Sequence, residues 1–265
     1  MPARSIASGT ISFGLVAIPI KLYTTGESSR RVSFNMVHEK CGTRVKYRYF
    51  CPTDEEFVER DELVKGYEIS KGQYVLFTLD ELKALEPEPT NAIEINEFVP
   101  LEQVDPIFYE KTYYLGPDKG GGKPYKLLAQ TMTDTNRAAL AMYAARGKNY
   151  LVLLRPYKEG LVMQQLRYVD EIREFSEVPI EDAKVTKQEL KLAKQLVDQT
   201  ASDKFQPEQY EDQERQRVWD LIEKKIQGEE IVATPEEEPK AQIIDLMEAL
   251  KASLGEGDKK AGKAT

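Results

Sequence analysis

The chain has 265 residues, a net charge of −8, two cysteines and a single histidine. With His38 alone and no Gly-x-Ser-x-Gly motif, the sequence offers no ordinary Ser–His or Cys–His catalytic centre. Two cysteines are too few for a disulfide framework and are typical of the reducing cytoplasm, where we expect the protein to reside. The sequence has no apolar run of about 18 residues, so it predicts no transmembrane helix. The first residues lack the pattern of a secretory signal.

Strands dominate the pattern up to about residue 170. An alternating apolar pattern begins at Ile11 and continues as a β-rich run to Tyr23. Further strands are predicted at 67–70, 73–78, 92–99, 107–115, 138–145, 150–155 and 161–168. A Lys71-Gly72 turn joins the first two of these into a hairpin. The last three form a meander, with a strongly basic turn at Arg146-Gly147-Lys148.

Helices are predicted at 80–86 and 124–133, and after about residue 175 the apolar period changes from 2 to 3.6. The capping box Thr186-Lys187-Gln188-Glu189 begins one long helix. A second begins near Pro207 and ends at Gly228. Its predicted buried residues are Tyr210, Val218, Leu221, Ile222 and Ile226. The sequence therefore predicts an α+β chain, with a strand-rich core at 1–175 and a helical arm at 176–228.

Residues 229–240 have the composition of a linker, with two prolines and three consecutive glutamates. Residues 241–265 comprise a short amphipathic helix and a tail rich in lysine and glycine. The apolar side of this helix consists of Ile243, Leu246, Met247, Leu250 and Leu254. An isolated helix of this length is marginal in water, so it either folds back on its own domain or docks into a partner's groove.

Charge is unevenly distributed along the chain. Residues 1–50 carry 8 Lys and Arg against 2 Asp and Glu, whereas residues 51–110 carry 4 against 16. Within the first of these, the segment 44–50 is predicted to form a strand with Arg44, Lys46 and Arg48 on one face. Cations at this spacing suit the phosphates of a polyanion, although the solvated outer face of a sheet has the same pattern.

No motif in the sequence predicts nucleotide hydrolysis. The loop 116–124 departs from the Walker pattern, because Pro117 stands at the first glycine position and Pro124 replaces the Ser or Thr that would hold magnesium. We interpret it as a mobile loop that carries Lys119 and Lys123. Carboxylates are abundant, but no spacing singles out a catalytic pair, so we expect neither a catalytic residue nor a cofactor.

A series of short segments, in a fixed order over about 250 residues, carries a family resemblance. They begin with Ser-Gly-Thr-Ile-Ser-Phe-Gly-Leu-Val at 8–16 and its continuation to Tyr23. The others lie at 64–68, 71–75, 105–107, 113–118, 146–147, 154–156, 166–168, 189–196 and 245–254. In these segments the chain resembles bacterial Ku, the DNA-end-binding component of prokaryotic non-homologous end joining.

The resemblance implies a β-barrel core with a C-terminal helical arm, assembled as a homodimer whose two chains close a ring around duplex DNA. A closed ring threads only onto a free end, which would give end specificity by topology. The resemblance also implies recruitment and stimulation of an ATP-dependent DNA ligase (ligase D) through residues 241–265, and association with the nucleoid. The candidate partner-binding residues are Ile243, Leu246, Met247 and Leu250.

A ring that slides along DNA must contact phosphates without recognising bases. The alternation at 44–50 makes Arg44, Lys46 and Arg48 candidates for these contacts. Arg146 and Lys148 are candidates because of the charge of their turn, and Lys65 and Lys111 because of their places in the family pattern. Each of the seven is also consistent with an ordinary solvated cation.

Two features depart from the family pattern. Ala7 stands where family members often carry Trp, so we expect a local change in packing. The spacing of His38, Cys41, Cys51 and Asp54 resembles a four-ligand zinc ribbon, but some relatives have Cys where Asp54 stands. Because aspartate is uncommon in structural zinc sites, two ordinary buried thiols are the alternative, and we do not assign a metal.

Two other functions are compatible with the sequence. One is a scaffold that recruits the ligase mainly through its C-terminal helix and touches DNA only weakly. The other is a weak lyase that acts at abasic DNA ends through a lysine amine, although no spacing selects such a lysine.

Overall fold

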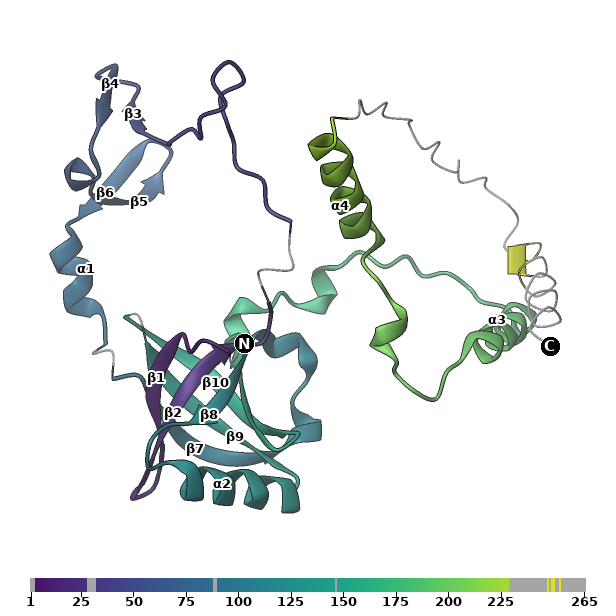
Figure 1. Cartoon of the computed structure of the whole chain (residues 1–265). Helices are drawn as coiled ribbons and strands as arrows, with labels where there is room; N and C mark the ends of the chain where they lie inside the picture. The colour runs from purple at the N-terminus through teal and green to yellow at the C-terminus, as the bar shows by residue number, and fades with distance from the viewer. Residues whose placement is uncertain are drawn as a thin grey trace. The chain divides into compact units, whose positions relative to one another are not determined.

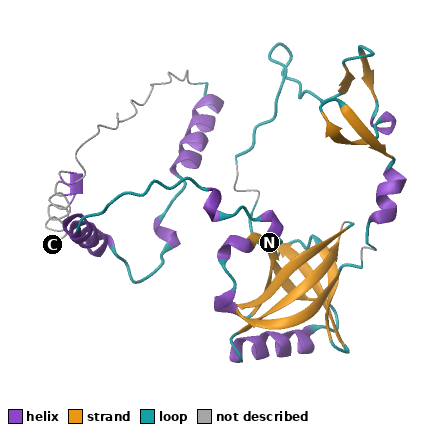
Figure 2. Cartoon of the chain, turned by 180° about the vertical axis from the view of Figure 1, so that it is seen from behind, coloured by secondary structure: helices purple, strands orange, loops and turns teal. Residues whose placement is uncertain are grey.

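The structure is a computed structural model that describes residues 3–27, 32–87, 90–145 and 147–228, together with Met247, Ala249, Leu250 and Ser253. The chain divides into two compact units, Met1–Glu174 and Phe175–Thr265. Figure 1 follows the elements along the chain, and Figure 2 distinguishes helices from strands. Within the described residues no helix is long and apolar enough to cross a membrane.

A closed seven-stranded barrel forms the centre of the first unit, which confirms the β-barrel expected from the resemblance (Figures 1 and 2). The strands are β1 (Ala7–Phe13), β2 (Val16–Thr24), β7 (Ala92–Pro100), β8 (Tyr109–Pro117), β9 (Arg137–Ala145), β10 (Lys148–Tyr157) and β11 (Gly160–Leu166). Their order around the barrel is β1-β2-β8-β11-β10-β9-β7. Each neighbouring pair is antiparallel except β1 and β7, whose parallel contact from Thr10↔Ala92 to Ser12↔Glu94 closes the barrel.

The predicted meander is confirmed, since β9 pairs with β10 and β10 pairs with β11. Alternate side chains of the strands fill the barrel, including Ile11, Ile20 and Leu154, which are fully buried. A second cluster lies on the outer side of β9, β10 and β11, around Leu153. The segment with the short helices η3 (Leu101–Gln103) and η4 (Pro106–Phe108) covers it.

Helix α2 (Gly122–Asp134) packs against β9, β10 and β11 and lies across one end of the barrel in Figure 1. Its buried residues are Tyr125, Leu128, Ala129 and Met132, whose spacing of three and four residues is that of one helix face. The β1–β2 and β10–β11 turns belong to this same end, whereas the β9–β10 turn belongs to the opposite end.

The segment 32–87 contains only small elements: β3 (Tyr49–Cys51), β4 (Glu56–Val58), η2 (Arg60–Glu62), β5 (Lys65–Ser70), β6 (Gln73–Phe77) and α1 (Leu79–Leu85). The predicted β5–β6 hairpin is confirmed, with Gly72 at φ +80° in its turn. Thr78 caps α1 through a capping box with Glu81. None of the described residues of this segment is buried.

In the second unit, α3 (Lys187–Thr200) begins at the predicted capping box of Thr186 and Glu189, after η5 (Val169–Glu171) at the end of the first unit and η6 (Phe175–Glu177). The prediction that the second helix begins near Pro207 is wrong. Pro207 begins a single 3-10 turn, η7 (Pro207–Gln209), and α4 (Gln213–Ile226) starts afresh where Asp212 accepts a hydrogen bond from the Arg215 amide.

The burial predicted for this second helix is only partly right. Val218 and Ile222 are half-buried, whereas Leu221 and Ile226 are exposed. Tyr210 is 83% exposed, because it lies between η7 and α4 and belongs to neither helix face.

Candidate nucleic-acid interface

Arg44, Lys46 and Arg48 are all exposed, but they do not lie on one strand. Arg44 forms an isolated bridge with Val37, and β3 starts only at Tyr49. The prediction of a strand over 44–50 is therefore wrong: within the described residues, Lys46 to Arg48 have no partner strand to hydrogen-bond with. The opposite side of the segment is not buried either, since Tyr47 is 86% exposed.

Two of these cations, Arg44 and Lys46, lie on the same concave surface. Its volume is about 650 Å³, and Phe34, Met36 and Tyr47 also line it. Exposed cations beside exposed aromatic rings suit the sugar–phosphate chain of a nucleic acid. Lys65, the first residue of β5, is exposed as well and pairs across the hairpin with Phe77.

Lys111 and Lys148 lie at the same end of the barrel, near the start of β8 and at the start of β10. Lys111 forms an ion pair with Glu110 at 3.3 Å, and Glu110 also accepts a hydrogen bond from Gln165 at 2.8 Å. Part of the Lys111 charge is therefore neutralised. Lys148 is exposed and has no ion pair among the described residues. Arg146, the other predicted cation of this turn, lies outside the described residues.

A small cavity of about 150 Å³ opens at this end of the barrel. Its lining includes Lys111 and Gln165 and three tyrosines, of which Tyr143 and Tyr150 have ring centroids 6.3 Å apart. Pockets that bind small organic ligands usually have volumes of about 300–1,000 Å³. The cavity is therefore too small for a nucleotide, and the cations around it are better suited to contacting phosphates on the surface.

At the opposite end, Tyr125 joins α2 to the barrel. Its hydroxyl donates a hydrogen bond to the Leu115 carbonyl at 2.5 Å and accepts one from the Leu161 amide at 2.7 Å. Burial raises the pKa of the Tyr125 hydroxyl above its ordinary value, so it remains a neutral donor. This contact fixes the helix to β8 and β11.

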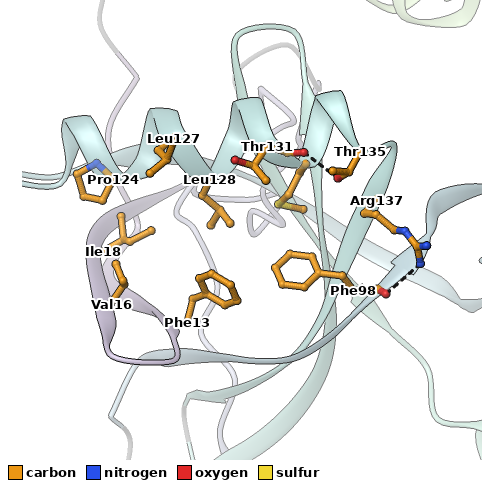
Figure 3. Close-up of a pocket in the computed structure, with 11 residues that line it drawn as sticks. Phe13, Val16, Ile18, Phe98, Pro124, Leu127, Leu128, Thr131, Thr135 and Arg137 are labelled. Atoms are coloured by element: carbon orange, nitrogen blue, oxygen red, sulfur yellow. Dashed lines mark hydrogen bonds between the residues drawn. The ribbon is translucent and has the colours of Figure 1, made fainter.

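Two different surfaces flank α2. On one side lies an apolar groove of about 400 Å³, lined by Phe13, Val16, Phe98 and Leu127 among others. Figure 3 shows these side chains converging, with Arg137 at the margin donating to the Phe98 carbonyl. On the other side lies a polar cleft of about 600 Å³, with Lys126, Lys158, Gln130 and Thr133 in its lining. With two lysines against one carboxylate, Glu159, the second surface is the better suited of the two to an anion.

The loop 116–124 is anchored to β2, which differs from its interpretation as a mobile loop. The Asp118 amide donates to the Pro19 carbonyl at 2.9 Å, and the Asp118 carboxylate pairs with Lys21 at 2.9 Å. The hydrogen bond between these side chains lowers the pKa of Asp118 and raises that of Lys21. The loop is therefore held against β2, with Lys119 exposed on this anchored turn and Lys123 exposed in the first turn of α2.

The four candidate zinc ligands form two separate pairs. His38 Nδ1 lies 3.3 Å from Cys41 Sγ, and Cys51 Sγ donates to Asp54 Oδ2 at 3.0 Å. No group of three or more His, Cys, Asp or Glu side chains in the described part of the chain is arranged to hold a metal. This geometry does not fit a four-ligand zinc site. The alternative of two buried thiols is also wrong, because Cys41 is exposed and Cys51 is half-buried.

Of the four candidate partner-binding residues, Met247 and Leu250 are helical and half-buried. Ile243 and Leu246 lie outside the described residues.

The sequence-based prediction missed Lys126 and Lys158. Each follows another cation by three residues, Lys123 and Arg155 respectively, but a pair at this spacing is too common in a chain with 37 Lys and Arg to single it out. A weak signal was available, since Arg155 and Tyr157 lie two residues apart on one strand, share a face of it, and come immediately before Lys158.

Comparison with known proteins agrees with this architecture. The sequence model of the Ku70/Ku80 beta-barrel domain matches residues 12–192. The non-homologous end joining protein Ku of Paraburkholderia phymatum is 45% identical over 262 residues, covering 98% of this chain and 85% of the relative. The Ku proteins of Koribacter versatilis and Bacillus subtilis are 40% and 38% identical, covering 95% and 93% of this chain and 86% and 80% of the relatives. The chain therefore belongs to the Ku family.

Proposed function

We propose that this protein binds the ends of double-stranded DNA as a homodimeric ring during non-homologous end joining, and that it recruits and stimulates an ATP-dependent DNA ligase, ligase D. Family membership over nearly the whole chain, in a fold built around the Ku barrel, is the observation that carries the proposal. The role is one of binding and recruitment, with the chemistry of ligation left to the partner.

The segment 32–87 supports a dimer. Its two-stranded sheets, β3–β4 and β5–β6, are marginally stable by themselves in water. Tyr67 and Val75 pair directly across the β5–β6 hairpin and so share one of its faces, and both are exposed. A second copy of the chain that covers these apolar residues would stabilise the segment and supply the other half of a ring.

The exposed cations support contact with DNA phosphates. Arg44, Lys46, Arg48 and Lys65 lie in the segment 32–87, and Lys111 and Lys148 lie at one end of the barrel. Within an acidic chain, such confined basic surfaces bind a polyanion in one place and repel it elsewhere. Contacts of this kind position the protein on DNA without selecting a sequence, as a ring at a broken end requires.

Recruitment of the ligase is assigned to residues 241–265. Met247 and Leu250 belong to one helix face, three residues apart, and an amphipathic helix of this kind can occupy an apolar groove of a partner. The linker composition of 229–240 suits a segment that reaches a partner.

A gel-shift titration tests the proposal, with one DNA sequence offered as a linear duplex and as a closed circle at two salt concentrations. Binding to the linear form alone is expected, because a closed ring needs a free end. Light scattering should give a mass twice that of one chain. Equal affinity for the two DNA forms, or a monomer at working concentration, would contradict the ring.

A further inference from the structure

Aromatic and cationic side chains gather on the outer surface of the barrel, near the end that α2 covers. Tyr114 of β8, Arg155 and Tyr157 of β10, and Lys158 of the β10–β11 turn form this cluster, which we name the aromatic platform. The rings of Tyr114 and Tyr157 are stacked, with centroids 6.0 Å apart. Arg155 Cζ lies 5.7 Å and Lys158 Nζ 5.5 Å from the centre of the Tyr157 ring.

A buried amide holds the arginine of the platform in place. Gln164 is 6% exposed and is the one buried side chain with an amide or a charge among the described residues. Burying an amide costs free energy unless it is hydrogen-bonded. Gln164 Oε1 accepts a bond from Arg155 Nε at 2.9 Å, and Arg155 Nη1 lies 3.5 Å from the Pro156 carbonyl. The guanidinium is therefore fixed beside the Tyr157 ring before any ligand arrives.

The lysine of the platform sits in a strained turn. Tyr157 pairs with Gly160, which leaves Lys158 and Glu159 as a two-residue hairpin loop. Lys158 has φ +52°, in the left-handed region where glycine is unstrained and a lysine is not. Strain of this kind, kept at an exposed position, is a reason to look for a function.

We propose that the aromatic platform binds unpaired nucleotides of a DNA overhang. Aromatic rings with adjacent cations are the common means of binding single-stranded nucleic acid, because every base has a face that stacks and every nucleotide carries a phosphate. Within a duplex only the terminal base pair has an uncovered face, whereas each nucleotide of an overhang can expose its base, so an overhang gains more stacking from the platform than a blunt end does. The polar cleft beside Lys158 is lined by Lys126, Gln130 and Thr133 as well as by the carboxylate of Glu159, and it provides room and hydrogen-bonding groups for a nucleotide outside the duplex.

This inference rests on the proposed function and adds the single-stranded overhang to the duplex end as a DNA structure that the protein binds. The test compares the affinity of the full-length protein for two hairpin-closed duplexes, one with a blunt end and one with a single-stranded extension of about six thymidines. We expect the wild-type protein to bind the extended duplex about tenfold more tightly, the size of a single base–aromatic stack.

Four variants separate the platform from the rest of the DNA surface. Tyr157→Leu should reduce the preference to within about twofold and leave blunt-end affinity unchanged, whereas Tyr157→Phe should retain it, because the ring is kept. Lys158→Gly should weaken the preference while leaving the protein at least as stable, because glycine relieves the strained φ. The control is Tyr168→Leu, since Tyr168 is 39% exposed and Tyr157 is 38% exposed. It should not change the preference.

Equal wild-type affinity for the two duplexes would overturn the proposal that the platform binds unpaired nucleotides. So would an equal loss of affinity for both duplexes in Tyr157→Leu, or the same loss of preference in the Tyr168→Leu control. Failure to bind either duplex end would overturn the proposed function instead, so the two failures are distinguishable.

Discussion

The contact between Tyr125 and the barrel gives a prediction about stability. Tyr125→Phe removes one hydroxyl and leaves the Leu161 amide without its acceptor and the Leu115 carbonyl without a donor. A buried backbone group that loses its hydrogen bond costs about 1–3 kcal/mol, so we expect the free energy of unfolding to fall by about 3 kcal/mol. For a unit of this size, that lowers Tm by about 6–12 °C.

Calorimetry of the two proteins at pH 8 measures this change. Tyr157→Phe is the control, because it removes the same atom from an exposed ring whose hydroxyl has no hydrogen bond among the described residues, and its Tm should stay within about 2 °C of wild type. If the Tm of Tyr125→Phe also stayed within about 2 °C of wild type, the hydroxyl would not hold α2 on the barrel.

The same hydroxyl predicts a dependence on pH. Its pKa is raised in the folded protein by burial, so its contribution to stability is complete below the unfolded pKa of about 10 and is lost as pH rises through the higher folded pKa. The stability difference between wild type and Tyr125→Phe should therefore shrink above pH 10. A difference that grows there would mean that the sign of the shift is wrong.

Three further predictions follow from the DNA surface, the C-terminal region and the candidate metal ligands. Replacing Arg44, Lys46 and Arg48 together by Ala should weaken binding to all DNA sequences alike. It should also reduce the slope of log K against log salt concentration by up to about 3, and an unchanged slope would place these residues outside the DNA contacts. Deleting residues 241–265 should preserve DNA binding and reduce stimulation of the ligase, and loss of DNA binding would show that this region belongs to the ring. Elemental analysis after metal-replete expression should give less than about 0.2 zinc per chain, whereas one zinc per chain would show that the two side-chain pairs come together on a metal.

The sequence predicted those parts of the fold that depend on neighbouring residues. The Lys71-Gly72 turn and the β9–β10–β11 meander were found because short loops pair consecutive strands. The start of α3 was found because a capping box is a local motif. The barrel itself was expected only from the family resemblance, since nothing local indicates the parallel contact of Thr10 with Ala92 across 82 residues.

The errors have a common physical cause. Alternation at 44–50 describes side chains, but a strand also needs a partner for its backbone, and the structure provides one only at Arg44 and from Tyr49 onward. The platform was missed for the complementary reason. Tyr114 and Tyr157 lie 43 residues apart in sequence, and β11 between β8 and β10 brings them together.

The closed ring is the central claim, and trapping on circular DNA tests it most directly. The protein is loaded on a linear plasmid, the plasmid is ligated into a circle, and the complex is challenged with high salt. Salt screens phosphate contacts, so a protein held by charge alone dissociates. A ring is expected to remain on the circle and to leave only when the DNA is cut again. Release from the circle as fast as from the linear plasmid would contradict the account.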